Sequence, residues 1–224
     1  MRTLRTLRTF ALLAFSLFMM ASCASRSEKM AEIMERLEAG EIPEDVNIFT
    51  IDQTESTLKW DASKVTGAHY GTVDIAHGEI YVFDGVLLAG EVNIDMNNIV
   101  VLDIQDPGTN ATLQGHLESD DFFSVDKHPL STLEIVRFDV IEGAAADEAN
   151  YRVFGNLTIK DITHGISFDA LILQEDNSIR AHASFDIDRT IWDIRYGSGK
   201  FFENLGDNMI HDLFTITFDI TAGK

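Results

Sequence analysis

The sequence predicts an all-β protein whose main domain is a closed antiparallel barrel of about eight strands, interrupted by one short helical insertion. From about residue 46 onward, apolar and polar residues alternate with a period of two in several segments, the pattern of half-buried antiparallel strands. The chain has only three prolines, and closing a sheet removes exposed edges that invite aggregation. A sandwich of two sheets remains the alternative, because alternation alone does not separate the two architectures.

The first 22 residues have the layout of a secretory signal. Three arginines, Arg2, Arg5 and Arg8, precede an uncharged apolar stretch over residues 10–20 that is short for a bilayer span. The small residues Ala21 and Ser22 then lead into Cys23, the only cysteine of the chain. The ending Met-Ala-Ser-Cys resembles a bacterial lipobox, which predicts lipidation at Cys23. An ordinary cleaved signal followed by a chance cysteine is the alternative.

A lipidated Cys23 places the protein in the bacterial cell envelope as a membrane-anchored lipoprotein. Two or more acyl chains hold a protein firmly to a membrane. Ala24 follows the cysteine, so the aspartate often read as an inner-membrane retention signal is absent, which favours the outer membrane. The domain would then lie in the periplasm or at the cell surface. With its one cysteine used for the anchor, the domain forms no internal disulfide.

Residues 23–46 are expected to form the lipidated N-terminus and a tether. The segment 25–40 is charged, and Met30, Ile33, Met34 and Leu37 recur at helical spacing. This spacing predicts a short amphipathic helix that is ended by Gly40 and Pro43 and packs on the domain or rests near the membrane.

The domain predicted over residues 47–224 contains five clear alternating segments. They lie at 91–96, 132–135, 151–159, 179–188 and 214–220, and weaker candidates lie at 57–65, 77–83 and 164–173. Turn-forming residues separate them, at Asp84-Gly85, around Gly143 and at residues 175–177.

Two stretches break the alternation. Residues 110–117 predict one or two helical turns, and the chain then continues through an acidic run into Phe122 and Phe123. An excursion of this length in a small β domain usually has a function. A second irregular stretch, residues 190–207, is rich in glycine and aromatic residues.

Several motifs, in order along the chain, resemble the YceI-like family of polyisoprenoid-binding proteins. The resemblance covers residues 49–220 and rests on the following segments: Ile51-Asp52 through Trp60, Gly78 through Phe83, Gly115-His116-Leu117, Phe122-Phe123-Ser124-Val125 through Pro129, Gly155-Asn156-Leu157-Thr158-Ile159 with Ile162-Thr163, and Phe185-Asp186-Ile187-Asp188-Arg189 with Trp192.

This resemblance implies an extended eight-stranded antiparallel barrel, similar to a lipocalin, with an apolar pore that takes an isoprenoid chain such as a quinone or polyprenyl tail. Non-catalytic binding of such a lipid, for carriage, storage or stress protection, is the function it implies. The stretch 191–209 departs from the family pattern and leaves open which ligand fits. The alternative is a filled barrel that acts as an interaction or assembly lipoprotein without a small-molecule ligand.

A lipid-binding barrel needs inward apolar and aromatic side chains that leave space unfilled. The predicted ligand-binding residues at the wall or mouth are aromatic: Trp60, Phe122, Phe123, Trp192, Phe201 and Phe202. The alternative for each of them is that it fills the core. Arg189 is predicted to pair with an acidic residue of the wall or to meet a polar headgroup.

The remaining composition argues against other functions. The chain carries 37 acidic and 17 basic residues, a net charge of −20, which argues against binding nucleic acid. Its seven histidines show no metal-binding spacing, and no nucleophile elbow or phosphate-binding loop is present. We therefore expect no enzyme, no metal and no cofactor beyond a bound isoprenoid or quinone. The oligomeric state stays open, a homodimer included.

Overall fold

The computed structural model describes residues 30–224. The signal predicted over residues 1–22 and the lipidation site predicted at Cys23 lie outside the described residues. Within residues 30–224, no helix is both long enough and apolar enough to span a bilayer.

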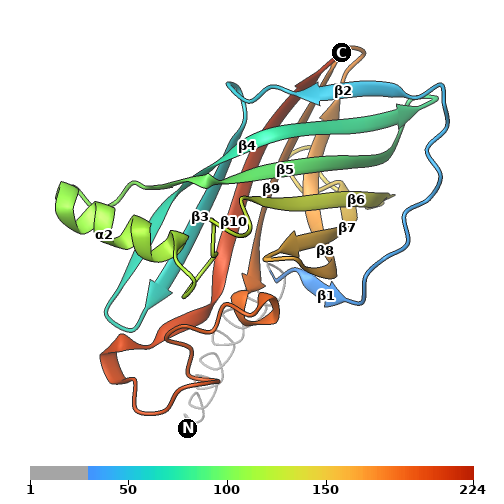
Figure 1. The fold of residues 1–224 in the computed structure, drawn as a ribbon. Helices are drawn as coiled ribbons and strands as arrows, with labels where there is room; N and C mark the ends of the chain where they lie inside the picture. The colour runs from blue at the N-terminus through green and yellow to red at the C-terminus, as the bar shows by residue number, and fades with distance from the viewer. Residues whose placement is uncertain (1–29) are drawn as a thin grey trace, which may run out of the picture.

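Eight long strands form a closed antiparallel barrel (Figure 1). They are β3 (Thr57–Lys64), β4 (Gly67–Phe83), β5 (Val86–Val101), β6 (Leu130–Val140), β7 (Tyr151–Ile159), β8 (Ile162–Gln174), β9 (Ser178–Asp188) and β10 (Ile210–Gly223). Each strand pairs with the next one along the chain, and β10 pairs with β3 to close the barrel. The predicted barrel is therefore confirmed, and each of the eight expected strand segments coincides with one of these strands, the segment 57–65 extending one residue beyond β3.

Two short strands complete the wall where long strands diverge. β2 (Asn47–Ile51) pairs with the second half of β4 and with the end of β10. β1 (Glu32–Met34) pairs with the first half of β8, because β8 and β9 are paired to each other only over residues 171–174 and 179–182. Met30, two residues before β1, bridges Asp186 of β9, so β1 fills the gap between β8 and β9.

The helix predicted from Met30 to Leu37 is wrong, because residues 32–34 form a strand of the sheet and residues 35–40 are not helical. The backbone of Glu35 passes so close to Gly165 that a Cβ there would lie 2.3 Å from the Glu35 carbonyl oxygen. The buried Asn156 of β7 binds the backbone of Leu37 at both its N–H and its carbonyl, at 2.7 Å and 3.0 Å. An open sheet edge thus overrides the helical spacing of four apolar residues.

The connections divide the barrel into two unlike ends. At one end lie α2 (Pro107–Glu118), the 3-10 turns η1 (Arg189–Trp192) and η2 (Gly206–Asn208), and the loop between these turns; we call this the α2 end. Asp106 caps α2 by accepting a hydrogen bond from the Thr109 N–H, and Pro107 starts the helix. The opposite end, called the C-terminal end, carries the β4–β5 and β8–β9 turns and the C-terminus.

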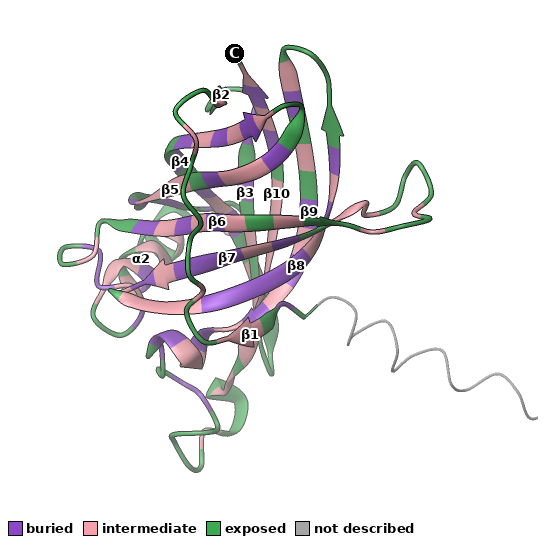
Figure 2. Cartoon of the chain, turned by 90° about the vertical axis from the view of Figure 1, so that its right-hand side faces the viewer, coloured by how far each residue is buried: buried purple, intermediate pink, exposed green. Residues whose placement is uncertain are grey.

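The strands carry a striped burial pattern (Figure 2). Buried residues alternate with exposed or half-buried ones along β6 and β9, which is the period-two alternation that predicted them. The buried side chains meet inside the barrel, where β-branched and aromatic residues dominate.

Candidate ligand-binding cavity

The inside of the barrel is not completely filled. A single apolar cavity has a volume of about 190 Å³. Its lining includes Ile51, Leu87 and Ile179 near the C-terminal end, and Phe122 and Ile194 near the α2 end, so the cavity is elongated and follows the barrel. Apolar cavities of about 150 Å³ stay dry and bind small hydrocarbons.

Nearly all of the wall is hydrocarbon. Every lining residue except Ser131, Arg189 and His211 is apolar. Most are aliphatic residues from the inward positions of the strands, and three phenylalanines form a cluster across β8, β9 and β10. Phe168 and Phe185 stack with ring centres 4.3 Å apart, and the Phe218 ring meets both edge-on. This lining suits a slender hydrocarbon.

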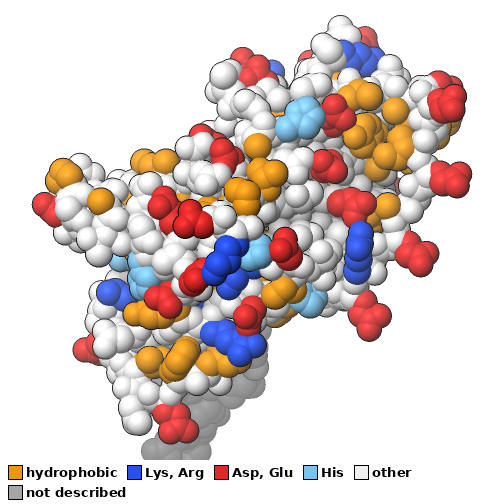
Figure 3. All heavy atoms as spheres, in the orientation of Figure 1, with side chains coloured by type: hydrophobic (Ala, Val, Ile, Leu, Met, Phe, Trp, Pro, Cys, Tyr) orange, Lys and Arg blue, Asp and Glu red, His pale blue; other side chains and the backbone are white. Residues whose placement is uncertain are grey.

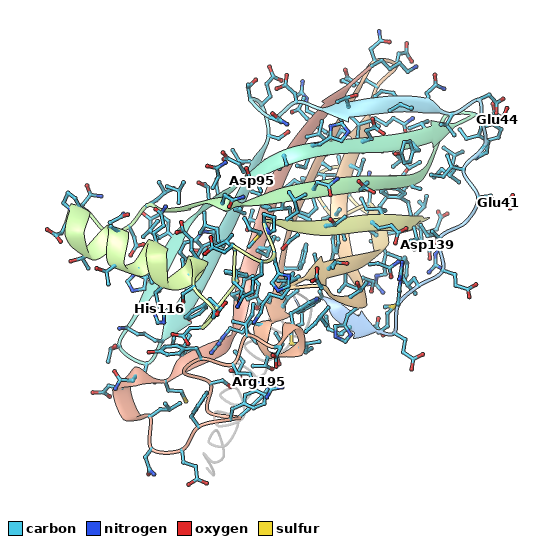
Figure 4. The ribbon with its side chains drawn as sticks, in the orientation of Figure 1. Glu41, Glu44, Asp95, His116, Asp139 and Arg195 are labelled. Atoms are coloured by element: carbon cyan, nitrogen blue, oxygen red, sulfur yellow. The ribbon has the colours of Figure 1, made fainter. Side chains whose placement is uncertain are left out.

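The α2 end is closed by contacts between the two irregular stretches. The rings of His116 at the end of α2 and of Phe122 lie 5.0 Å apart, and both pack against Tyr196 from the loop after η1. Figure 4 shows His116 on the side of α2 that faces this loop, which also carries Arg195. Both excursions therefore form one cover over this end of the cavity.

Arg189 ties the base of this cover together. Its guanidinium donates hydrogen bonds to the carbonyls of Ile194, Ile210 and His211, at 2.9 to 3.3 Å. Burial lowers the pKa of Arg189, opposed by the charge of Asp212, whose carboxylate lies 3.7 Å away. Of the two predicted roles for this arginine, the geometry supports pairing with an acidic residue.

A second cation holds the same region. Lys200 donates hydrogen bonds to Asp188 and to Thr190, and it lies 3.5 Å from Asp212. Burial raises the pKa of Asp188, but the hydrogen bonds from Lys200 and Thr190 outweigh it and hold this pKa below its usual value. The loop between η1 and β10 is therefore fastened at Arg189 and at Lys200.

Three of the six predicted aromatic residues line the cavity. Trp60 lies on the wall with its Nε1 donating to the Thr72 carbonyl, and Phe122 and Phe123 close the α2 end. Both phenylalanines reach the cavity because residues 120–123 form a turn. The expectation that adjacent side chains point apart holds for strands only.

The other three aromatic residues lie elsewhere. Trp192 is completely buried, donates its Nε1 hydrogen to the Leu157 carbonyl and packs against His164, but it is outside the lining. Phe201 and Phe202 are 45% and 49% exposed on the outer loop. Trp192 thus fills the core behind the wall, and the two phenylalanines face solvent.

The six predicted aromatic residues account for only a small part of the lining. The wall consists largely of aliphatic residues such as Leu133, Ile135 and Ile187. Their signal was present in the alternation itself, because every second residue of a barrel strand faces inward. Among residues 30–224, no group of three or more histidine, cysteine, aspartate or glutamate side chains is placed to hold a metal ion.

Fold and cavity together define a lipocalin-like protein: a closed antiparallel barrel around an apolar interior. The sequence profile of the YceI-like domain matches residues 49–222, and the chain belongs to the YceI-like family. A search of curated proteins found no match.

Among the solved structures that share the fold are two from Burkholderia cenocepacia and Saccharophagus degradans. Burkholderia cenocepacia BcnA is 16% identical, with a TM-score of 0.60 over 76% of this chain and 98% of that chain. A polyisoprenoid-binding domain from Saccharophagus degradans implicated in plant cell wall breakdown is 15% identical, with a TM-score of 0.56 over 78% of this chain and 97% of that chain. At these identities the likeness concerns the fold.

Proposed function

We propose that this protein binds a lipid with an isoprenoid or quinone-like chain in its barrel, without catalysing a reaction on it. The observation that carries the proposal is the continuous apolar cavity, whose lining has only three polar residues. Membership in the YceI-like family and a structural neighbour described as polyisoprenoid-binding support the same ligand class.

The energetics favour such a ligand. Burying a methylene group contributes about 0.8 kcal/mol, so one five-carbon isoprene unit contributes roughly 3 kcal/mol. About four buried units would reach the approximately 8 kcal/mol of micromolar affinity after several kcal/mol of ordering cost, so such a ligand must widen the cavity of about 190 Å³ or extend beyond it. An unfilled apolar interior also counts against the alternative of a filled barrel that serves only interaction or assembly.

The proposal includes a location. Cys23 acts as the lipid anchor of an envelope lipoprotein, in the outer membrane, with the domain in the periplasm or at the surface. Carriage, storage or stress protection of the bound lipid is the role there. Labelling with a radioactive fatty acid tests the anchor, since Cys23→Ala removes the label if this cysteine is acylated.

Lipid extraction tests the ligand. Protein purified from a bacterial host is extracted with organic solvent, and the extract is analysed by mass spectrometry for isoprenoids and quinones. Ala170 lines the cavity and is buried, so Ala170→Phe should lower the bound lipid by about tenfold or more, as lost contacts of about 1.4 kcal/mol suffice for this. Ala68 is exposed and outside the lining, and Ala68→Phe is the matched control.

The outcome is decided by wild type and variants together. Thermal unfolding of each variant establishes that it is folded before its lipid content is compared. A wild-type protein that carries no lipid and takes up neither a quinone nor a polyprenol contradicts the proposal, as does equal lipid content in Ala170→Phe and Ala68→Phe.

A further inference from the structure

The loop between η1 and β10 exposes an unusual group of aromatic side chains. Tyr196, Phe201 and Phe202 are 42%, 45% and 49% exposed. Among the described residues they account for all exposed aromatic side chains except Tyr70. Aromatic rings are costly to leave in water, and concentrated exposure of this kind marks an interaction surface.

The loop holds these rings in place. Ser198 is completely buried. Its backbone carbonyl accepts hydrogen bonds from the backbone N–H groups of both Phe201 and Phe202. Gly197 has a positive φ of 64° and packs against Ile210, which only glycine allows without strain. The phenylalanines are therefore presented on a fastened loop.

Charged side chains of both signs accompany the rings: Arg195 and Lys200 lie beside them, and Glu203 follows Phe202. The Arg195 guanidinium lies 4.8 Å from the centre of the Phe201 ring, and Lys200 precedes the phenylalanine pair. Figure 3 shows hydrophobic side chains beside lysine or arginine side chains at the lower end of the visible face. The turns of the C-terminal end carry the acidic residues Asp84, Glu175 and Asp176 and no lysine or arginine. Aromatic rings with neighbouring lysine and arginine are the side chains that anchor proteins at the interface of a bilayer.

The position of the loop on the barrel also fits contact with a bilayer. Its base supplies Ile194, Ile210 and Arg189 to the cavity lining, so a bilayer at this loop lies beside the α2 end of the cavity. The chain also leaves the barrel at this end, because the Ala31 N–H bonds to the carbonyl of Asp186 near the end of β9. Six residues separate Met30 from Cys23, a reach of at most about 25 Å.

We propose that the loop 195–202 docks on the surface of a phospholipid bilayer through Tyr196, Phe201 and Phe202. The α2 end of the barrel then faces the membrane. The contact is driven by the rings, since Arg195 and Lys200 are paired with Asp193 and Asp188, so zwitterionic lipid suffices. The docking surface is formed by the loop alone, whereas the short distance from Met30 to the membrane rests on the lipid anchor at Cys23 proposed above.

Depth-dependent quenching tests this docking. The full chain is reconstituted in phosphatidylcholine vesicles that contain brominated lipid, once as Phe201→Trp and once as Val86→Trp. Val86 is 66% exposed at the C-terminal end and serves as the matched control. After subtraction of the native tryptophan signal, the new tryptophan at position 201 should be quenched at least about twofold more than the one at position 86.

A second measurement removes the anchor. With Cys23→Ser in vesicles of phosphatidylcholine, the double substitution Phe201→Ser/Phe202→Ser should weaken binding by about tenfold, as expected for two half-exposed rings, while circular dichroism stays unchanged. Equal quenching at positions 201 and 86, or equal vesicle binding with and without the rings, overturns the docking surface. Lipid content measured on the same samples separates this result from failure of the ligand proposal, because a barrel that retains lipid but shows no quenching rejects docking alone.

Discussion

The side chain of Asn156 offers the most direct test of whether the N-terminal segment belongs to the barrel. Only 2% exposed, it makes two hydrogen bonds with the Leu37 backbone and one of 2.8 Å to Glu134. Each bond contributes about 1 kcal/mol net. Asn156→Ala removes all three, so we expect a loss of about 3 kcal/mol in the free energy of unfolding, reduced where water reaches the freed Leu37 groups.

Hydrogen exchange locates the effect. The Leu37 amide should lose its protection in Asn156→Ala, and the Ala31 amide, which bonds to Asp186, should exchange faster as β1 detaches. Among themselves, the amides in the middle of β10 should keep the same ranking of exchange rates in Asn156→Ala as in the wild type. Urea denaturation measures the global loss.

Two control variants and a second substitution that displaces β1 complete this test. Asn93 is half-buried and binds only side chains, so Asn93→Ala should leave β1 unchanged. Gly165→Ala should detach β1 by collision with the Glu35 backbone, whereas Gly115→Ala meets no neighbour within 4 Å. Unchanged exchange at Leu37 in both Asn156→Ala and Gly165→Ala would refute the argument that these contacts hold the segment.

Three further predictions concern the α2 end. Arg189→Met leaves three carbonyls without their donor and should cost about 2–4 kcal/mol in urea denaturation; a loss below 0.5 kcal/mol, roughly the effect of a surface change, would contradict the role of Arg189 as a fastening. Trp192→Phe loses the hydrogen bond to Leu157 and should cost about 1–2 kcal/mol while leaving lipid content unchanged, since Trp192 lies outside the lining; a large drop in bound lipid would show otherwise. Because the pKa of Asp188 is lowered in the folded protein, its contribution to stability is present above the unfolded value of about 4 and lost as the pH falls through the folded value. Thermal unfolding from pH 7 to pH 2 should therefore show a smaller acid-induced decrease for Asp188→Asn, and identical profiles would exclude this contribution.

The alternation of apolar and polar residues predicted the barrel because each barrel strand has one face toward solvent and one face toward the apolar interior. Residues 132–135, 179–188 and 214–220 alternate throughout, and each lies in a strand of the structure. The alternation of apolar and polar residues involves only near neighbours in the sequence, so it can be recognised without knowing which strands pair with each other. The same alternation marked the inward residues that line the cavity, most of which are aliphatic and not aromatic.

That a residue is aromatic did not by itself predict whether it lines the cavity. Phe122 reaches the cavity from a turn, Trp192 fills the core behind the wall, and Phe201 lies on the outer loop. These three outcomes depend on how the two irregular stretches fold over the end of the barrel. Tertiary contacts decide how these stretches fold, for example the hydrogen bonds from Arg189 to Ile194 and Ile210. The residues in such contacts do not recur at regular intervals, so no sequence periodicity predicts them.

The amino-acid sequence by itself determined the all-β class, the approximate strand positions and the YceI-like motifs, because periodicity and turn chemistry act between near neighbours. Only the tertiary structure decided that residues 32–34 form a strand and that the barrel encloses unfilled space. A short apolar segment takes the conformation of the edge it meets, here the gap between β8 and β9. The empty volume is a small difference between the space that the strands enclose and the volume of side chains that point into it, and it exists only once all eight strands are in register.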